Sequence, residues 1–600
     1  MSSIFSNTNH HFHIPVLGTG FSIDTPLKVA PLGINSVISL VDDDLIEKAR
    51  SYHAEREGKP FIAIAKNERD YRARRIQAYL DLLDILVEER FQAALASFPD
   101  GEASRSYFDL LPPGTLREEY ARFGALASGS EKAALGASLK AAMRKGNIDV
   151  NIMTKLDRSP PGVPETEHGT DASSVLRGYA QSTVDSTLVL SAGMNPRLFD
   201  YMTKFDAFTL DALGKARKRI AIKVSDYRSA FIQGLQLARK GLWTSEFRVE
   251  SGLNCGGHAF ATKGSLLGPI LEEFKAKRTE LTDKLRSAFH DACAALGRPS
   301  PISPEFMLSV QGGVGTHAEH ELLRHKYGAE SVGWGSTFLL VPEATNVDEA
   351  SLTLLEKSAD EDIVLSDASP LGVPFWILRD SASEIRREKL IAEGKPGTGC
   401  PKGFLAMNEE FGSKPLCTAS AAYLKKKTVD IEAKQEAGIL TPSAAALLMQ
   451  SVLAKACLCR DLASSFLTRV SLEKNGTTEV TVGPGIAYFK SRTSLSDMVS
   501  HIYGRLDLLG ESKRPHFFVR EAALYVDYLK AELGGAADDL AKKGKKYFED
   551  FQRNLLSGLA YYEEISAEIV EAERERFLAA LDQLAVEAKA LLNSMALVAV

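Results

Sequence analysis

Residues 307–315 read MLSVQGGVG and residues 331–337 read SVGWGST, and in each stretch a short apolar run ends in a glycine loop. Residues 246–258, EFRVESGLNCGGH, have the same form. Such runs favour strands and the glycines favour turns. Similar strand signals precede them, at residues 13–20, 34–40, 148–153, 186–191 and 219–224. Helical spacing between the strands indicates a parallel α/β fold, and a repeat count near eight predicts a closed (β/α)8 TIM barrel.

The alternation of strands and helices is interrupted after the first two strands. Residues 42–145 carry apolar residues at helical spacing with abundant charge, which predicts a helical insertion. The barrel is therefore expected to comprise residues 1–41 and 146–345. Residues 346–490 are irregular and hold four of the six cysteines, and residues 491–600 indicate a mostly α-helical C-terminal extension.

The composition excludes several classes of protein. The chain has 600 residues, 44% hydrophobic and 25% charged, which is ordinary for a globular protein. Its net charge of −6 provides no basic field for nucleic acid. No apolar run reaches roughly 18 residues, so no membrane-spanning helix is expected. Six cysteines are too few for a disulfide scaffold, and the cytoplasm is the expected compartment.

The three glycine loops are the candidate ligand site. Glycines let backbone amides approach a phosphate, and successive loops late in a parallel barrel are the usual phosphate site of that fold. One such glycine pair alone is more typical of a tight turn. Three of them in barrel order favour phosphate binding.

Five segments match a known pattern in order: DVNIM (149–153), IKV (222–224), ESGLNCGGH (250–258), SVQGG (309–313) and VGWGSTFL followed by PE (332–343). Together they resemble the nitronate monooxygenase (2-nitropropane dioxygenase-like) family of FMN-dependent barrels. The resemblance covers about 240 of the first 345 residues and leaves the helical insertion unmatched.

The resemblance implies FMN. It implies that the flavin phosphate lies on the glycine loops, that Asn151 and Lys223 face the flavin ring or ribityl chain, and that the loop at residues 17–19 lines the ring. The residues so implied in cofactor binding are Leu17, Gly18, Thr19, Asn151, Lys223, Gly256, Gly257, Gly312, Gly313, Gly333, Gly335 and Ser336.

Two side chains of the 250–258 loop are candidate catalytic groups. His258 matches the histidine that serves the family as catalytic base or substrate ligand, and a histidine can exchange protons near neutral pH; the alternative is a structural histidine. Cys255 replaces the family's alanine and is either an active thiol or a small buried filler. Asn254 replaces an acidic residue, so the substrate chemistry is expected to differ.

The cysteines of the extension suggest a metal site. Cys400, Cys417, Cys457 and Cys459 fall within 60 residues, and four thiols can hold a 4Fe–4S cluster or zinc. The spacing contains no Cys-x-x-Cys pair, so four unrelated thiols are the alternative. The turn-rich residues 366–374 are expected to cap the barrel mouth.

The leading hypothesis is an FMN-dependent oxidoreductase of the nitronate monooxygenase type that acts on a small organic substrate, with an Fe–S cluster as an electron relay. One alternative is a flavin-dependent enoyl or sulfur-compound reductase that uses Cys255. Another is a non-redox barrel that binds a protein partner through its helical regions. The expected partners are a substrate and an electron donor or oxygen, with no nucleic acid and no membrane. Formation of a homo-oligomer through the C-terminal helices is a further hypothesis.

Overall fold

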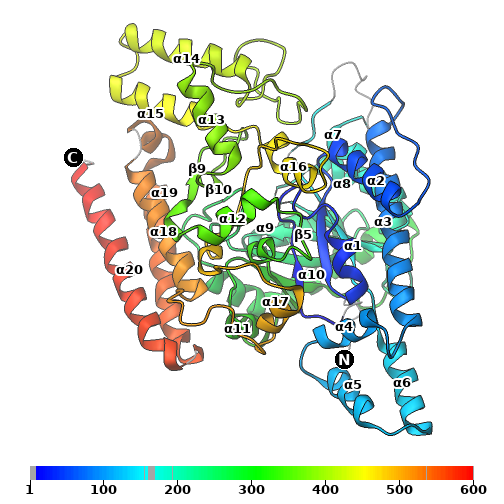
Figure 1. Ribbon diagram of the computed structural model, residues 1–600. Coiled ribbons are helices and arrows are strands. Elements are labelled where there is room, and N and C mark those ends of the chain that lie inside the picture. The colour runs from blue at the N-terminus through cyan, green and yellow to red at the C-terminus, as the bar shows by residue number, and fades with distance from the viewer. Residues whose placement is uncertain are drawn as a thin grey trace.

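Eight parallel strands follow one another in hydrogen-bonded order and close into a barrel, because β1 pairs with both β2 and β8 (Figure 1). The computed structural model describes residues 9–154, 156–159, 169–191, 193–534, 537–569 and 571–598. The closed order of eight parallel strands confirms the predicted (β/α)8 barrel. The strands are β1 (Phe12–Ile14), β2 (Asn35–Ser39), β3 (Ile148–Ile152), β4 (Ser186–Leu190), β5 (Lys218–Val224), β6 (Thr244–Glu250), β7 (Met307–Gln311) and β8 (Ser331–Gly333).

The central strands are buried on both faces. Every residue of β3 and of β4 is buried, as expected where helices cover a parallel sheet. Part of the buried barrel is polar, because Arg248 donates from Nε to Glu246 Oε1 at 2.7 Å and the Ser309 hydroxyl also donates to Glu246. These buried charges are paired, which offsets the cost of removing them from water.

Helices connect the strands and pack outside the barrel. Side chains cap several of their first turns: Asp226 accepts from Ser229 N at α9, and Thr316 and Glu319 form a capping box at α11. The helices in the barrel region are α1 (Thr25–Val29), α7 (Asp171–Gln181), α8 (Pro196–Met202), α9 (Tyr227–Ala238), α10 (Leu267–Leu296) and α11 (His317–Tyr327), with the 3-10 helix η3 (Ser336–Leu340) after β8.

Five helices lie between β2 and β3, in the segment predicted to be a helical insertion. The long helix α3 packs on α2 and α7, and the end of α3 shares a small apolar core with α4–α6. The helices are α2 (Asp43–Arg56), α3 (Tyr71–Ala96), α4 (Glu102–Leu110), α5 (Thr115–Ala125) and α6 (Ser130–Ala142).

The region after residue 345 is more ordered than the sequence indicates. It contains a two-stranded antiparallel sheet as well as helices. Its elements are α12 (Glu349–Lys357), β9 (Ile363–Ser366), β10 (Phe375–Leu378), α13 (Ala382–Ala392), α14 (Ala421–Glu436), α15 (Pro442–Leu453), α16 (Leu458–Arg469), α17 (Leu495–Ile502), α18 (Phe517–Leu533), α19 (Ala537–Glu564) and α20 (Glu571–Val598).

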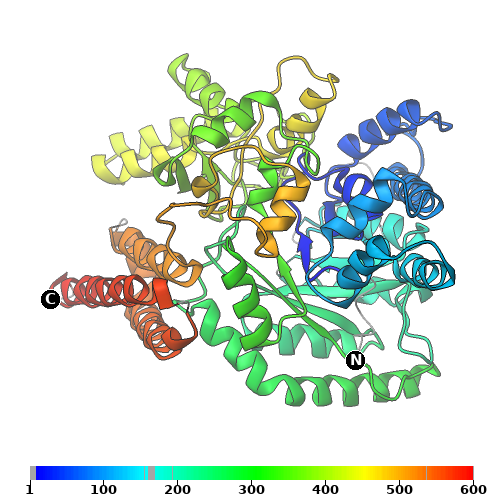
Figure 2. The same ribbon diagram turned by 60° about the horizontal axis from the view of Figure 1, so that its bottom comes forward.

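The insertion and the C-terminal helices flank opposite sides of the barrel. Both views place α2–α6 on one side and α18–α20 on the other (Figures 1 and 2). The main apolar core nevertheless runs without a break from barrel residues such as Phe12 and Val310 to Phe518 and Leu581 in the C-terminal helices. The C-terminal helices are therefore part of the barrel's own core.

One apolar stretch in the described part of the chain, Pro442–Arg469, could cross a membrane by its length and composition alone. It comprises α15 and α16 with non-helical residues 454–457 between them. In α16, Ala463 and Phe466 are buried in the main core. This is weak support for a membrane segment, because core helices pass the same test.

Candidate functional site

The three predicted glycine loops lie side by side at the carboxyl end of the barrel. They follow β6, β7 and β8, and these strands are hydrogen-bonded neighbours: Glu250 pairs with Gln311, and Gln311 with Gly333. The carboxyl ends of barrel strands are where enzymes of this fold place their chemistry. The topology therefore assembles one site from three separate loops.

Close approach between the loops requires glycine at two positions. A Cβ on Gly313 would lie 2.0 Å from Nδ2 of Asn254, and one on Gly312 would lie 2.7 Å from Cβ of Ser251. Both glycines also have positive φ, +133° at Gly312 and +78° at Gly313, which other residues rarely adopt. The close packing and the backbone conformation thus require glycine at both positions, independent of any ligand.

The same loops present backbone donors that no protein group uses. Among the described residues, no acceptor is found for the N–H groups of Gly313, Gly335 and Ser336. Partly buried amides normally find a partner. A row of such donors on two adjacent loops fits an anion such as a phosphate, so the donor set fits the phosphate of FMN.

Glu319 and Arg514 hold the β7 loop in this orientation. Glu319 accepts from Gly315 N at 2.8 Å and pairs with Arg514 at 2.7 Å, and Arg514 also donates to the carbonyl of Gly313. Arg514 keeps the pKa of the Glu319 carboxyl below its usual range although burial opposes this. Arg514 thus binds the carbonyl of Gly313, and Glu319 caps the first turn of α11. The backbone N–H groups that keep no protein acceptor belong to the glycine loops.

A strap from the segment 346–490 lies over the glycine loops; we define it as residues 481–485, Thr-Val-Gly-Pro-Gly. Gly257 N donates to Thr481 Oγ1 at 2.8 Å, and Gly483 N donates to Ser336 Oγ at 2.6 Å. A Cβ on Gly256 would lie 2.9 Å from the carbonyl carbon of Val482. The Gly257 amide and the Ser336 hydroxyl are therefore already engaged by the chain itself.

His258 sits at the mouth beside a loop that closes over it. Its Nε2 lies 2.7 Å from Ser369 Oγ, and its ring packs edge-on against Phe375, 4.9 Å between centroids. Ala259 N donates to Pro374 O at 2.9 Å, so the 366–374 loop is tied to the β6 loop. The expected cap over the barrel mouth therefore has a physical attachment at His258.

Cys255 is half-buried in the β6 loop. Its thiol donates to Gln311 O at a long 3.7 Å. Burial, reinforced by the Glu250 carboxylate, raises the pKa of the thiol well above its usual value. A thiol kept protonated at neutral pH is a poor nucleophile, which favours the filler interpretation over the active-thiol one.

Lys223 on β5 and Asn151 on β3 are engaged by protein groups. Lys223 Nζ lies 3.0 Å from Glu250 Oε1, which also accepts from Gln311 Nε2 at 2.6 Å. Asn151 Nδ2 donates to Val189 O at 3.1 Å. Contact of either with a flavin stays a prediction.

The N-terminal loop lies next to the β8 loop. A Cβ on Gly335 would lie 3.6 Å from Cδ2 of Leu17. Gly18 has a φ of +108°, and the side chain of Thr19 is buried. Gly333 packs against Gln311, since a Cβ added to Gly333 would lie 2.7 Å from Cβ of Gln311. The predicted cofactor residues thus gather at one end of the barrel.

The four cysteines lie near one another without forming a recognisable metal site among the described residues. The Cys400 and Cys417 side chains interact, and Cys459 lies within electrostatic reach of Cys400, Cys417 and Cys457, whereas Cys457 also interacts with the side chain of Thr398. Across the described residues, no three His, Cys, Asp or Glu side chains are arranged to hold a metal ion. The described residues therefore do not support the predicted 4Fe–4S or zinc centre, and Cys400 lies at the exposed surface.

Three mouth residues were not predicted: Thr481, Arg514 and Glu521. Glu521 is buried beneath the β6 loop, where it accepts from Ser251 Oγ at 2.6 Å and from Leu267 N at 2.9 Å. Each of the three lies more than 190 residues from its partner in the loops, so no local spacing marks it. Only the Gly-Pro-Gly of the strap is a local signal, and it indicates merely a turn.

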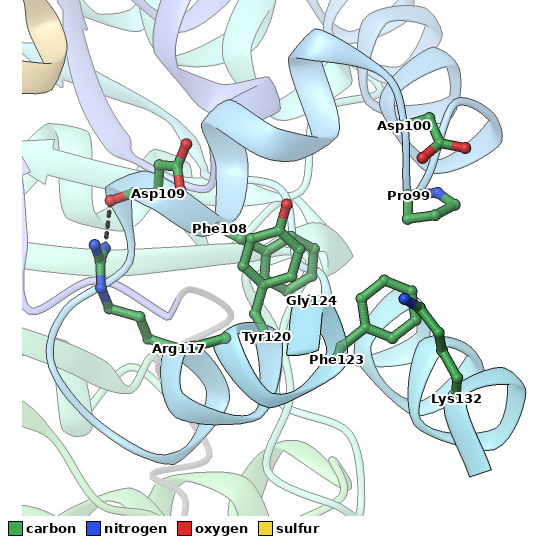
Figure 3. Close-up of a pocket in the computed structure, with 10 residues that line it drawn as sticks. Pro99, Asp100, Phe108, Asp109, Arg117, Tyr120, Phe123, Gly124 and Lys132 are labelled. Carbon is green, nitrogen blue, oxygen red and sulfur yellow. Dashed lines mark hydrogen bonds between the residues drawn. The ribbon is translucent and has the colours of Figure 1, made fainter. Parts of the chain in front are cut away.

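A separate open pocket of about 430 Å³ lies in the helical insertion (Figure 3). Phe108 and Tyr120 stack along it with ring centroids 4.3 Å apart, and Arg117 donates to the carbonyl of Asp109. Its lining, which also includes Lys132, comes wholly from the insertion. It contains none of the predicted site residues.

No protein-family model and no curated protein sequence matches the chain. Similar solved structures include FabK from Thermotoga maritima, at 14% identity over 65% of this chain and 88% of that one, with a TM-score of 0.30. The enoyl reductase domain of MlnA from Bacillus amyloliquefaciens matches at 14% over 63% and 86%, with a TM-score of 0.33. Nitroalkane oxidase from Streptomyces ansochromogenes matches at 11% over 84% and 97%, with a TM-score of 0.33. At these values the matches assign neither family nor activity, and the fold rests on the strand order itself.

Proposed function

We propose that this chain is an FMN-dependent oxidoreductase that acts on a small organic substrate at the carboxyl end of the barrel. The observation that carries the proposal is the row of free N–H donors on the β7 and β8 loops. Bound there, FMN supplies two-electron redox chemistry, and the protein supplies position and electrostatics.

The chain's own residues have distinct parts in this proposal. The amides of Gly313, Gly335 and Ser336 hold the phosphate, and Gly312 lets the loop approach it. His258 holds or moves a proton at Nε2, with Ser369 fixing the direction of the ring. The loop at residues 17–19, next to Gly335, lines the ring of the cofactor.

The proposed reaction type is nitronate oxidation, as the family resemblance suggests. A reductase that depends on a Cys255 thiolate is not proposed, because burial and Glu250 raise the pKa of that thiol. A 4Fe–4S relay is not proposed either, since the described residues do not form a metal site. The cytoplasmic location rests on the sequence and stays a prediction.

The first test uses the glycine at the proposed phosphate site. Gly313→Ala adds a methyl group 2.0 Å from the Asn254 amide, whereas Gly372→Ala has a similar φ, +69° against +78°, and open space. Both variants lose roughly 1–2 kcal/mol of stability to positive φ. We expect Gly372→Ala to retain FMN and Gly313→Ala to lose it, measured as protein-bound flavin absorbance after reconstitution.

The substrate assay follows on the flavin-loaded protein. We expect oxygen consumption with the nitronates of small nitroalkanes and none with NADH or NADPH plus an enoyl thioester. The reverse pattern would assign a reductase. Wild-type protein that binds no flavin after reconstitution would refute the proposal and favour the non-redox scaffold.

A further inference from the structure

The open pocket in the helical insertion has an aromatic wall and room for a small ligand. Its volume of about 430 Å³ is typical of sites that bind small organic molecules. The stacked rings of Phe108 and Tyr120 line it together with the ring of Phe123 (Figure 3). Aromatic rings pack favourably on one another, so this wall fits a flat aromatic ligand.

A glycine on α5 keeps the pocket open. Gly124 lines the pocket, and a Cβ added to it would meet no atom of the described residues within 4 Å. Its φ is not positive, so it is not the left-handed glycine that ends many helices. Glycine within a helix is less favourable than alanine. Neither packing nor backbone conformation therefore requires glycine here, whereas a larger side chain would take up space in the pocket.

Arg117, at the edge of the pocket, has one side of its guanidinium group free. Its Nη1 donates to the carbonyls of Asp109 and Leu111, and among the described residues no acceptor is found for its Nε and Nη2. Arg50 and Arg387 bind carboxylates through these same two nitrogens, with Nη2–oxygen distances of 2.7 and 2.6 Å. The free side of Arg117 is therefore the side that binds a carboxylate with two hydrogen bonds.

The positive charge around the pocket is not neutralised by ion pairs. Arg505 donates to the same two carbonyls as Arg117, at 2.8 and 3.3 Å, and Lys132 Nζ donates to another carbonyl at 2.8 Å. In the part of the chain that the structure describes, none of the three cations pairs with a carboxylate. Asp100 and Asp109 also line the pocket, but both are exposed, and the Asp109 carboxylate points away from Arg117 (Figure 3). This arrangement favours an anion.

We propose that the pocket of the helical insertion binds a small aromatic carboxylate. The carboxylate accepts from Nε and Nη2 of Arg117, and the ring packs against Tyr120 and Phe123. The lining contains no residue of the glycine loops. The proposal needs no flavin, so it stands or falls separately from the proposed oxidoreductase.

The test compares two probes with the same ring and opposite charge, naphthylacetate and naphthylmethylammonium. Each is titrated into the full-length protein, and binding is followed by saturation-transfer NMR. We expect naphthylacetate to bind with a Kd of about 1 mM or tighter, as fragments of this size do. The cation should bind on the order of 10-fold more weakly or less.

Variants locate the binding site. Arg117→Gln should weaken naphthylacetate binding on the order of 10-fold, while Arg505 still holds the two carbonyls. Gly124→Leu places a side chain in the pocket and adds a helix-favouring residue, so binding should be lost without loss of thermal stability. Ala125→Leu is the control, because this exposed neighbour in α5 does not line the pocket and should bind as wild type does.

Three results would overturn the proposal. The first is no binding of naphthylacetate at about 10 mM. The second is binding of the cation as tight as that of the anion, which would assign the site to the carboxylates of Asp100 and Asp109. The third is unchanged binding in Gly124→Leu, which would place the probe elsewhere. Ala121→Leu, also in the lining of the pocket, repeats the third test if thermal unfolding shows that Gly124→Leu does not fold.

Discussion

His258 depends on a partner from outside the barrel. The histidine belongs to the β6 loop, but its hydrogen-bond partner Ser369 comes from the loop between β9 and β10. A general base must be held in one orientation to act efficiently. At the scale of single residues, the mouth is therefore completed by later parts of the chain.

The role of His258 can be measured by paired substitutions. We expect His258→Asn to retain FMN and to lower kcat on the order of 100-fold or more, because proton transfer is lost. Ser369→Ala should lower kcat by less, because the ring keeps its packing on Phe375. Stopped-flow flavin reduction checks both, and an unchanged rate in His258→Asn would make the histidine structural.

Glu521 makes stability depend on pH. Burial raises its pKa from 4.5 to about 7, partly opposed by hydrogen bonds from Ser251, Leu267 and Tyr562. A carboxyl with a raised pKa in the folded state stabilises the fold below pH 4.5, and this contribution is lost as pH rises toward 7. The full change is on the order of 3 kcal/mol.

The comparison is with Glu521→Gln, which cannot ionise. We expect the wild-type protein to lose stability relative to this variant between pH 5 and pH 7.5, measured by chemical unfolding at each pH. The control is Glu563→Gln, at an exposed position of α19. Parallel curves for wild type and Glu521→Gln would contradict the assignment.

At the scale of elements, two hydrogen bonds tie the strap to the glycine loops, from Gly257 N to Thr481 Oγ1 and from Gly483 N to Ser336 Oγ. Thr481→Val removes the acceptor of Gly257 N and keeps the side-chain shape. We expect a loss of about 1 kcal/mol in stability and faster amide exchange across residues 254–260. Thr428→Val, which removes a hydroxyl bonded within α14, is the control and should leave that exchange unchanged.

The sequence predicts the barrel well because each strand and its glycine loop are local. It predicts the mouth less well, because Thr481 and Glu521 reach partners 224 and 270 residues away and carry no local pattern. The cysteines illustrate both cases. Four cysteines within 60 residues predict that thiols lie close together. How many of them converge depends on how separate segments pack, and the spacing along the chain does not determine this.

At the scale of the whole molecule, barrel and extension share one apolar core. We therefore expect a chain of residues 1–345 to lack a cooperative thermal transition and to bind a hydrophobic dye, because surfaces that α18 covers become exposed. Full-length protein is the control, measured by circular dichroism and dye fluorescence. A soluble fragment with one sharp transition would contradict this expectation.

The residues that support the barrel-mouth loops lie late in the chain, and this affects how the protein folds during synthesis. The barrel strands are complete at residue 333, but Glu521, which supports the β6 loop, is synthesised much later. At about 5–20 residues per second, that delay is on the order of 10–40 s. During translation the barrel strands are therefore present before the residues that support the loops at their carboxyl end. We expect a chaperone that shields this end of the barrel to improve the yield of folded protein.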